Sequence, residues 1–248
     1  MSTSIMITGA SSGIGKALAL ELASRGYSLG LAARRKDGLD ALAAEIRQRH
    51  GDGFRVETRP LDVTDYDAVP RVLQEFVDAL GGLDIVFANA GIGSEGRIGD
   101  GHFEDARRTI ETNVIGAMAT VDAAAAYFLE RGHGHVVATS SVAAFRGLPG
   151  SSAYCASKAA LTTYMGALRA ETWKRGIAVT VLHPGYIDTP INSTMASRPF
   201  LITVDKGARL IADMIERRVP SATVPVWPWN VIGRVLRWLP TGLIARMG

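Results

Sequence analysis

The stretch Thr8-Gly9-Ala10-Ser11-Ser12-Gly13-Ile14-Gly15 decides the fold. A short β-rich run, Ser4-Ile5-Met6-Ile7-Thr8, precedes it, and a segment with helical apolar spacing follows it. Glycines at a strand-to-helix turn let the backbone approach a phosphate, and the N–H groups of the first helical turn are free to bind it. A glycine-rich turn alone is often only a tight connection, but the flanking strand and helix favour a dinucleotide site. The expected contacts are Gly9, Ser11, Ser12, Gly13, Ile14 and Gly15.

Working outward from this turn, strand-like and helix-length segments alternate along the chain. The predicted strands are Ser4 to Thr8, Ser28 to Ala32, Phe54 to Thr58, Leu83 to Ala88, His135 to Ser140 and Ile177 to His183. Such alternation predicts an α/β fold, a doubly wound (Rossmann-like) parallel sheet with helices on both faces. Ligands of such sheets bind beyond the carboxyl ends of the strands, so the loops that follow the strands are where chemistry is expected.

Composition limits the class of protein. The chain has 248 residues and one cysteine, which predicts one domain, no internal disulfide and a reducing, cytoplasmic location. Five arginines and no acidic residue follow Glu216, so subtracting their charges from the overall +3 leaves the preceding residues at −2. The main body is therefore not basic, and no nucleic acid partner is expected. No metal site is expected, because the histidines lack cysteines or carboxylates at ligand spacing.

The end of the second strand bears on which cofactor binds. Many NAD sites have an acidic residue there for the ribose 2′-hydroxyl, whereas this chain has Arg34 and Arg35. A guanidinium at Arg34 would pair with a 2′-phosphate, which favours NADP(H). The alternative is that both arginines form a solvated loop pair.

Two further loops follow strands at the same edge of the sheet. Asp62-Val63 follows the third strand, and Asn89-Ala90-Gly91 follows the fourth. Asp62 alone would serve equally well as a helix cap, and Asn89 as a turn former. Together with the glycine-rich turn, these loops predict a cofactor-binding site at this edge of the sheet.

A tyrosine and a lysine four residues apart form the candidate acid/base pair. Tyr154 and Lys158 lie on one face of a predicted helix, and a nearby cation favours the phenolate. Tyr154 would then exchange a proton with a carbonyl or an alcohol. Ser140 and Ser141 end the fifth strand, and spacing alone leaves both as candidates to hold the substrate oxygen.

These motifs, in this order and followed by Pro184-Gly185, resemble the short-chain dehydrogenase/reductase family over most of the chain. The resemblance implies that Ser141 rather than Ser140 is catalytic and that Asn113 completes a tetrad by supporting a water relay to the lysine. It also implies that Asp62 and Val63 contact the adenine, that Lys158 binds the nicotinamide ribose, and that Thr189 lies beside the carboxamide. The further cofactor positions are Asn89, Ala90, Gly91, Tyr154, Pro184, Gly185 and Ile187.

The expected function is that of an NADP(H)-dependent oxidoreductase of a small carbonyl or alcohol substrate. The rival interpretation is a non-catalytic nucleotide-binding regulator or scaffold of the same fold. The alanines from Ala123 to Ala126 suit either an internal helix face or a subunit contact, and the family resemblance favours a homodimer or homotetramer through the long helices.

Two segments complete the domain predicted over residues 1–248. Residues 190–203 are expected to be a substrate lid, which includes Met195, Phe200 and Leu201. Residues 227–248 form an amphipathic extension in which Pro228 and Pro240 bracket a short helix. Its expected apolar side is Val231, Ile232, Val235, Leu236 and Leu239. Packing on protein is favoured for this extension, with weak peripheral membrane contact as the alternative. No stretch is expected to span a membrane.

Overall fold

A computed structural model describes residues 2–93, 95–195 and 197–247 as a three-layer α/β fold. Its centre is a seven-stranded sheet in the order β3-β2-β1-β4-β5-β6-β7, with every neighbouring pair parallel. The strands are β1 (Ser4–Thr8), β2 (Ser28–Ala33), β3 (Val56–Pro60), β4 (Ile85–Ala88), β5 (Gly134–Thr139), β6 (Ile177–Pro184) and β7 (Ser221–Val224). The chain order reverses between β1 and β4, and ligands of such sheets bind beyond the strands at this point.

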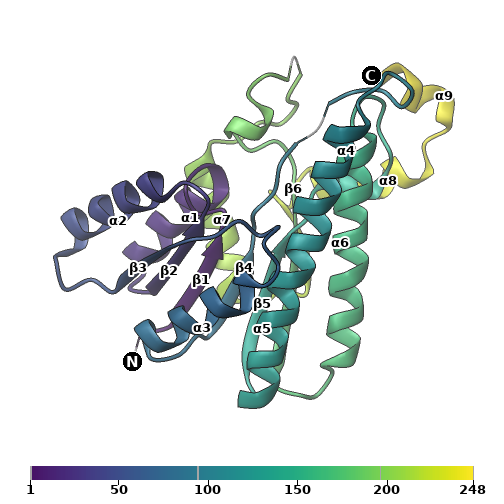
Figure 1. Cartoon of the computed structure of the whole chain (residues 1–248). Helices are drawn as coiled ribbons and strands as arrows, with labels where there is room; N and C mark the ends of the chain where they lie inside the picture. The colour runs from purple at the N-terminus through teal and green to yellow at the C-terminus, as the bar shows by residue number, and fades with distance from the viewer. Residues whose placement is uncertain (1, 94, 196, 248) are drawn as a thin grey trace.

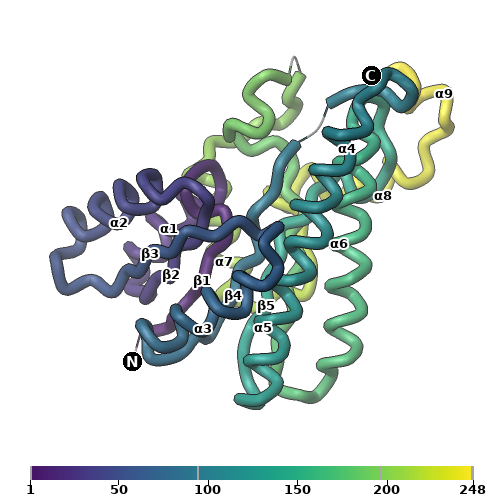
Figure 2. The backbone as a smooth tube through the Cα atoms, in the orientation of Figure 1, coloured from purple at the N-terminus to yellow at the C-terminus, as the bar shows by residue number. Residues whose placement is uncertain are grey.

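Helices cover both faces of the sheet (Figure 1). One layer contains α1 (Gly13–Ser24), α2 (Lys36–His50) and α7 (Val204–Glu216). The other contains α3 (Ala68–Leu80), α5 (Ala117–Arg131) and α6 (Ser152–Glu171). Helix α4 (Phe103–Ile110) continues into α5 through a π-helical turn, η1 (Glu111–Gly116), and the tube view shows this long run lying alongside α6 (Figure 2).

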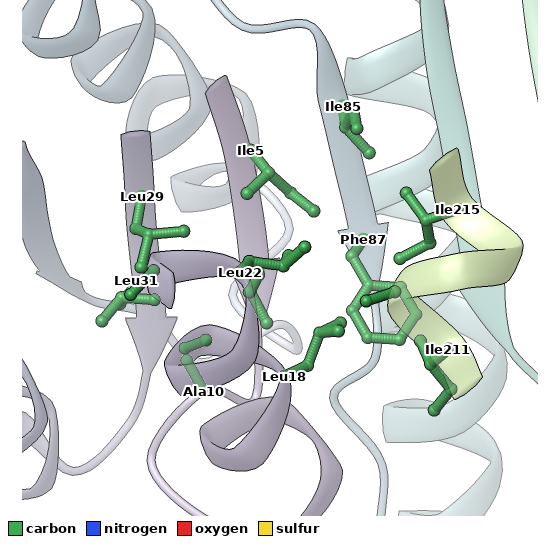
Figure 3. Close-up of a cluster of buried hydrophobic side chains, with 14 of the residues drawn as sticks. Ile5, Ala10, Leu18, Leu22, Leu29, Leu31, Ile85, Phe87, Ile211 and Ile215 are labelled. Carbon is green, nitrogen blue, oxygen red and sulfur yellow. The ribbon is translucent and has the colours of Figure 1, made fainter. Parts of the chain in front are cut away.

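Apolar side chains on alternate strand positions supply a separate core for each face. Leu18 and Leu22 of α1 and Ile211 of α7 meet Ile5 and Phe87 of the sheet (Figure 3). The opposite face packs side chains such as Phe76 and Phe128 against the sheet. Strands buried on both faces explain why these segments are continuously apolar.

The predicted doubly wound fold is confirmed, and the six predicted strands are all present with ends shifted by at most two residues. The seventh strand, β7, was missed. It has only four residues, Ser221–Val224, between Pro220 and Pro225, and one of the four is an exposed serine. A strand this short at the edge of the sheet carries too little apolar periodicity to be recognised from sequence.

The sequence predicts no stretch that could span a membrane, but one helix meets the length and composition criteria for a span. The continuous helix Phe103–Arg131 is long and apolar enough, but half of its most apolar window is buried inside the protein. Its buried side chains pack in the second core, as expected for a core helix of an α/β fold. Of the alanines in this helix, Ala124 and Ala125 are buried and Ala126 is exposed.

The C-terminal extension is helical, as predicted, but its buried face differs from the expected one. Helix α8 (Trp229–Trp238) buries Trp229, Gly233 and Leu236, while Val231 and Val235 are exposed. Gly233 sits so close to the ring of Phe145 that the helix turns this small residue inward. A four-residue helix α9 (Thr241–Ile244) and a 3₁₀ turn, η4 (Ala245–Met247), follow, and residue 248 lies outside the described residues.

The segment expected to be a lid leaves the sheet after β6 and returns before α7. The residues just before this segment pair with its C-terminal end. Ile202 N donates to Tyr186 O (3.1 Å), and Asp188 N donates to Ile202 O (2.9 Å). Between them lies a 3₁₀ turn, η3 (Pro190–Asn192). Arg198 also pairs with Asp188 (2.6 Å), and residue 196 lies outside the described residues.

Candidate active site

The glycine-rich turn forms a close-packed bend between β1 and α1. Gly9 (φ +70°) and Gly13 (φ +54°) adopt left-handed backbone conformations that favour glycine. A Cβ on Gly15 would lie 2.4 Å from Gly9 O, so a side chain there would force the turn open. Ser12 precedes α1 and makes no side-chain cap, which leaves the N–H groups of the first helical turn for a ligand. These features fit a pyrophosphate.

A set of hydrogen bonds fixes the loop after β4 against the neighbouring strand ends. Thr8 Oγ1 accepts from Asn89 N (3.0 Å) and Ala90 N (3.1 Å). Asn89 Nδ2 donates to Thr8 O (3.0 Å), and Asn89 Oδ1 accepts from Thr139 Oγ1 (3.1 Å). Asn89 therefore joins the ends of β1 and β5 and holds Gly91 at the floor of the site.

The arginines after β2 lie beside the other expected cofactor residues. Arg34 Nη1 is 3.8 Å from Asp62 Oδ2, and both side chains are largely exposed. Arg35 Nη2 donates to Ser11 Oγ (3.2 Å), which brings a second guanidinium to the glycine-rich turn. Asp62 also accepts from Thr64 N (3.0 Å), so it caps its own turn as well as facing Arg34. Val63 is buried, in contact with the position of Gly116 in the π-helical turn.

Helix α6 brings Tyr154 and Lys158 together at the carboxyl ends of the strands. Lys158 is buried, and its Nζ lies 5.7 Å from the centre of the Tyr154 ring. The same Nζ donates to Thr139 O (2.8 Å), which fixes the ammonium at the end of β5. A Cβ on Gly91 would lie 3.5 Å from Nζ and 3.1 Å from Asn113 Oδ1. The absence of a side chain at Gly91 thus leaves room beside both groups.

The expected lowering of the Tyr154 pKa by Lys158 is wrong for the protein on its own. Burial raises the pKa of the Tyr154 phenol above its ordinary value, and a hydrogen bond from Ser141 opposes the rise only in part. Burial also lowers the pKa of the Lys158 ammonium to about 8. Burial therefore displaces both pKa values toward the neutral forms, although a lysine pKa of about 8 leaves the ammonium mostly protonated at neutral pH.

The structure separates the roles of the two serines that spacing left open. Ser140 Oγ donates to Lys158 O (2.9 Å) and contacts Thr162 Oγ1 (2.7 Å), so this buried side chain ties β5 to α6. Ser141 Oγ accepts from Ala143 N (3.1 Å) and donates to Pro184 O (3.4 Å), and it lies close enough to the Tyr154 phenol to oppose the rise of its pKa. Ser141 is accordingly the serine that shares the site with the phenol.

Asn113 lies in the π-helical turn, an irregularity that often occurs at functional sites. Its Oδ1 accepts from Ile92 N (2.8 Å), and its Nδ2 donates to Ile92 O (2.8 Å) and Ser157 Oγ (3.1 Å). Both amide hydrogens are engaged, so the side chain positions the loop after β4 and the base of α6.

The loop after β6 lies across the site from the glycine-rich turn. A Cβ on Gly13 would lie 3.5 Å from Thr189 Cβ, which places Thr189 across from the glycine-rich turn. Thr189 Oγ1 donates to Ile187 O (3.1 Å), and Ile187 is buried. Gly185 approaches the Trp229 indole so closely that a Cβ there would be 2.1 Å from Nε1, while Pro184 O accepts from Ser141 Oγ (3.4 Å). The expected cofactor positions thus follow the ends of β1, β2, β3, β4 and β6, and α6 adds Tyr154 and Lys158.

Other reactive side chains lie outside this cluster. A cavity of about 490 Å³ is lined by Cys155, Ala159 and Arg146 among others, but not by Ser141, Tyr154 or Lys158. Burial raises the pKa of the Cys155 thiol, so the thiolate is disfavoured there. Within residues 2–93, 95–195 and 197–247, no three His, Cys, Asp or Glu side chains gather as a metal site.

Several residues of the site were missed by sequence reasoning. Thr8 and Thr139 fix the loops through hydrogen bonds, and Arg35 contacts Ser11. Tyr186 and Trp229 form an edge-to-face pair at 5.8 Å beside Gly185. Thr8 and Thr139 lie at or next to the ends of predicted strands, and Arg35 follows Arg34. The sequence therefore contained signals for these three residues. Trp229 gave none, because its approach depends on how the C-terminal helix docks.

Comparison with known proteins agrees with this geometry. Residues 3–199 match the family model described as short chain dehydrogenase. An uncharacterized oxidoreductase of Mycobacterium tuberculosis is 42% identical over 98% of this chain and 96% of its own length. A short-chain type dehydrogenase/reductase of Mycobacterium marinum is 31% identical, with a TM-score of 0.80 over 89% of this chain and 92% of its own. An alcohol dehydrogenase from Thermococcus sibiricus, solved with 5-hydroxy-NADP, is 28% identical, with a TM-score of 0.81 over 90% of this chain and 96% of its own.

The family match spans most of the chain and includes the glycine-rich turn and the tyrosine–lysine pair. The chain therefore belongs to the short-chain dehydrogenase/reductase family, whose oxidoreductases use nicotinamide cofactors on small molecules and often form oligomers.

Proposed function

We propose that this protein interconverts a carbonyl and an alcohol with NADP(H), using Tyr154 as the acid/base. The observation that carries the proposal is the cluster of Ser141, Tyr154 and Lys158 beside the side-chain-free floor at Gly91. Reduction of C=O to CH–OH needs one hydride at carbon and one proton at oxygen. The nicotinamide cofactor, when bound, supplies or accepts the hydride.

The proton would come from Tyr154 Oη. Because burial raises the phenol pKa, the group carries its proton at neutral pH and is ready to donate it during reduction. The Ser141 hydroxyl, which lies beside the same phenol, would turn from Pro184 O to the substrate oxygen and orient it for this transfer. Asn113 would act as a positioning residue, since it fixes the loop around Gly91 and the base of α6.

The ammonium of Lys158 would support proton transfer at two points. Its 5.7 Å approach to the Tyr154 ring stabilises the phenolate left after donation, and its buried position beside Gly91 suits a hydrogen bond to a cofactor ribose. With its pKa lowered to about 8, the lysine also exchanges its proton near neutral pH. Such a group would return a proton to the Tyr154 phenolate between turnovers.

The residues present fit NADP(H). The uncapped N-terminus of α1 would hold the pyrophosphate, and Asp62 with Val63 would flank the adenine. Arg34 has only a long, exposed contact with Asp62, so its guanidinium can turn to a 2′-phosphate at small cost. Arg35, held on Ser11, would provide a second cation on the same side. The Thermococcus sibiricus alcohol dehydrogenase was solved with 5-hydroxy-NADP, while other structural neighbours were solved with NAD or NADH.

A non-catalytic regulator of the same fold is the rival. The retained serine, tyrosine, lysine and asparagine, which gather around the phenol and Gly91, favour an enzyme. The test is a panel of ketones, aldehydes and alcohols in which NADPH absorbance is followed with the wild type and with Tyr154→Phe. Turnover of at least one substrate that the variant loses is expected. Calorimetric binding of NADPH without turnover of any substrate would favour the regulator.

A further inference from the structure

The C-terminal segment presents an apolar surface that the proposed reaction does not use. We define the tail surface as five exposed side chains, namely Trp227 (72% exposed), Val231 (43%), Val235 (51%), Trp238 (87%) and Leu243 (48%). Within α8, Val231, Val235 and Trp238 follow the i, i+4, i+7 spacing of one helix face. The opposite face faces the protein.

This surface is held in place by contacts on the inner side of α8. Trp229 is buried against Gly185 and meets the rings of Tyr186 (5.8 Å) and Phe200 (6.0 Å) edge-on. Gly233 packs on Phe145, and Arg146 Nη2 donates to Leu239 O (3.4 Å). These contacts hold α8 against the rest of the protein and leave the tail surface on the outer side of the helix.

The charges around the tail surface have one sign. Arg234, Arg237 and Arg246 are exposed, and no Asp or Glu follows Glu216 in the sequence. In the part of the chain that the structure describes, none of these three guanidinium groups lies within 4.0 Å of a carboxylate. Arg237 instead lies over the Phe145 ring at 4.9 Å. The guanidinium groups are thus available to an anionic partner.

We propose that the tail surface docks this protein peripherally onto membranes that contain anionic lipids. Exposed tryptophans suit the headgroup region, because an indole has an apolar body and a polar N–H. Arginines beside them would meet lipid phosphates and carboxylates, and the apolar side chains between them would enter the acyl boundary. The short α8 lies in the interface and does not span the bilayer.

A second copy of the chain fits this surface less well. A two-fold contact through the tail surface would bring the arginines of both copies close together with no acidic residue of either tail between them. Anionic lipid removes that repulsion and supplies the missing opposite charge. The inner face of α8, opposite the tail surface, contacts the proposed lid through Trp229 and Phe200.

The test uses the full chain with vesicles of phosphatidylcholine alone or with about 30% phosphatidylserine. Flotation and tryptophan fluorescence are measured for the wild type, Trp227→Ser/Trp238→Ser, Arg234→Glu/Arg246→Glu and the matched control Trp173→Ser. Trp173 is 70% exposed but follows the far end of α6, a helix about 30 Å long, so it lies away from the tail surface. NADPH binding and melting temperature check that each variant is folded.

We expect wild type and Trp173→Ser to float with phosphatidylserine vesicles and to show blue-shifted emission, more strongly at low salt. The double tryptophan variant should bind at least about tenfold more weakly, and the double arginine variant should lose the preference for anionic vesicles. The proposal is overturned if the wild type does not float. It is also overturned if the tryptophan variant binds as well as the control, or if the variants change oligomer mass and leave flotation unchanged. Loss of flotation with unchanged turnover separates this proposal from the proposed reaction.

Discussion

At the residue scale, burial sets the protonation of the groups that would do the chemistry. Tyr154 and Lys158 have pKa values displaced toward their neutral forms, the phenol upward and the ammonium downward. A phenol that is protonated at neutral pH is in the form that donates a proton during carbonyl reduction, whereas alcohol oxidation requires the phenolate.

Replacing Tyr154 with Phe removes the proton donor and keeps the ring. We expect turnover to fall by about 10²–10⁴-fold while NADPH affinity stays close to wild type. Lys158→Ala should lower both quantities, because the ammonium lies beside the phenol and the Gly91 floor. Steady-state kinetics with calorimetry measures the two effects. A Tyr154→Phe enzyme that keeps most of its rate on every active substrate would assign the acid/base role elsewhere.

Arg34 should decide between the two nicotinamide cofactors. We expect NADPH to bind at least about tenfold more tightly than NADH, and Arg34→Ala to remove most of that preference, since about 1.4 kcal/mol corresponds to tenfold. Arg71→Ala, an exposed arginine of α3, is the control. Calorimetric titration of both cofactors gives the answer. Equal affinities in the wild type, or a preference unchanged in Arg34→Ala, would contradict the assignment.

Two buried histidines should make stability depend on pH. Burial lowers the pKa of His135 to about 4 and that of His183 to about 4, from an ordinary value near 6.5. Between those values the unfolded chain binds more protons than the folded one, so the free energy of unfolding decreases as the pH falls from about 6.5 toward 4. Each histidine contributes about 3 kcal/mol over that range. Denaturation of His135→Gln should show a shallower fall, and a slope equal to wild type would contradict this.

At the scale of elements, the turn between β1 and α1 has no room for a further side chain at Gly15. Gly15→Ala would place a Cβ 2.4 Å from Gly9 O, so the turn must open and its backbone N–H groups must leave their phosphate-binding positions. We expect NADPH affinity to fall at least tenfold. Gly166→Ala is the matched control, because that glycine lies in α6 with nothing within 4 Å of its added Cβ, and it should raise helix stability by about 1 kcal/mol. Equal NADPH affinity in both variants would show that the turn does not bind the cofactor.

The elements also show what sequence could and could not predict. Hydrophobic periodicity and turn residues predicted six strands and the helices between them. The four-residue spacing of Tyr154 and Lys158 predicted that they share a helix face. The burial of Tyr154 and of Lys158, which displaces both pKa values toward the neutral forms, depends on tertiary packing that no local pattern records. The orientation of α8 depends likewise on contacts between residues far apart in the sequence, such as Gly233 with Phe145 and Trp229 with Gly185.

At the scale of the whole molecule, the long helices leave small and apolar side chains unpaired on the outside. Ala156, Ala160 and Ala167 are exposed along α6, and Ile115 is 40% exposed on the neighbouring helical run. Side chains this small let a second helix pair approach closely, so we expect a homodimer or homotetramer built through these faces.

Placing one charge on that face tests the assembly. Ala160→Glu should lower the mass measured by light scattering, because an unpaired carboxylate cannot be buried between two apolar helices without a large desolvation cost. Ala44→Glu, an exposed alanine on α2 in the opposite helical layer, should keep the wild-type mass. The proposed active site lies at the strand ends, among residues of a single chain. A folded Ala160→Glu monomer should therefore still bind NADPH, and a wild type that is monomeric at all concentrations would refute the predicted interface.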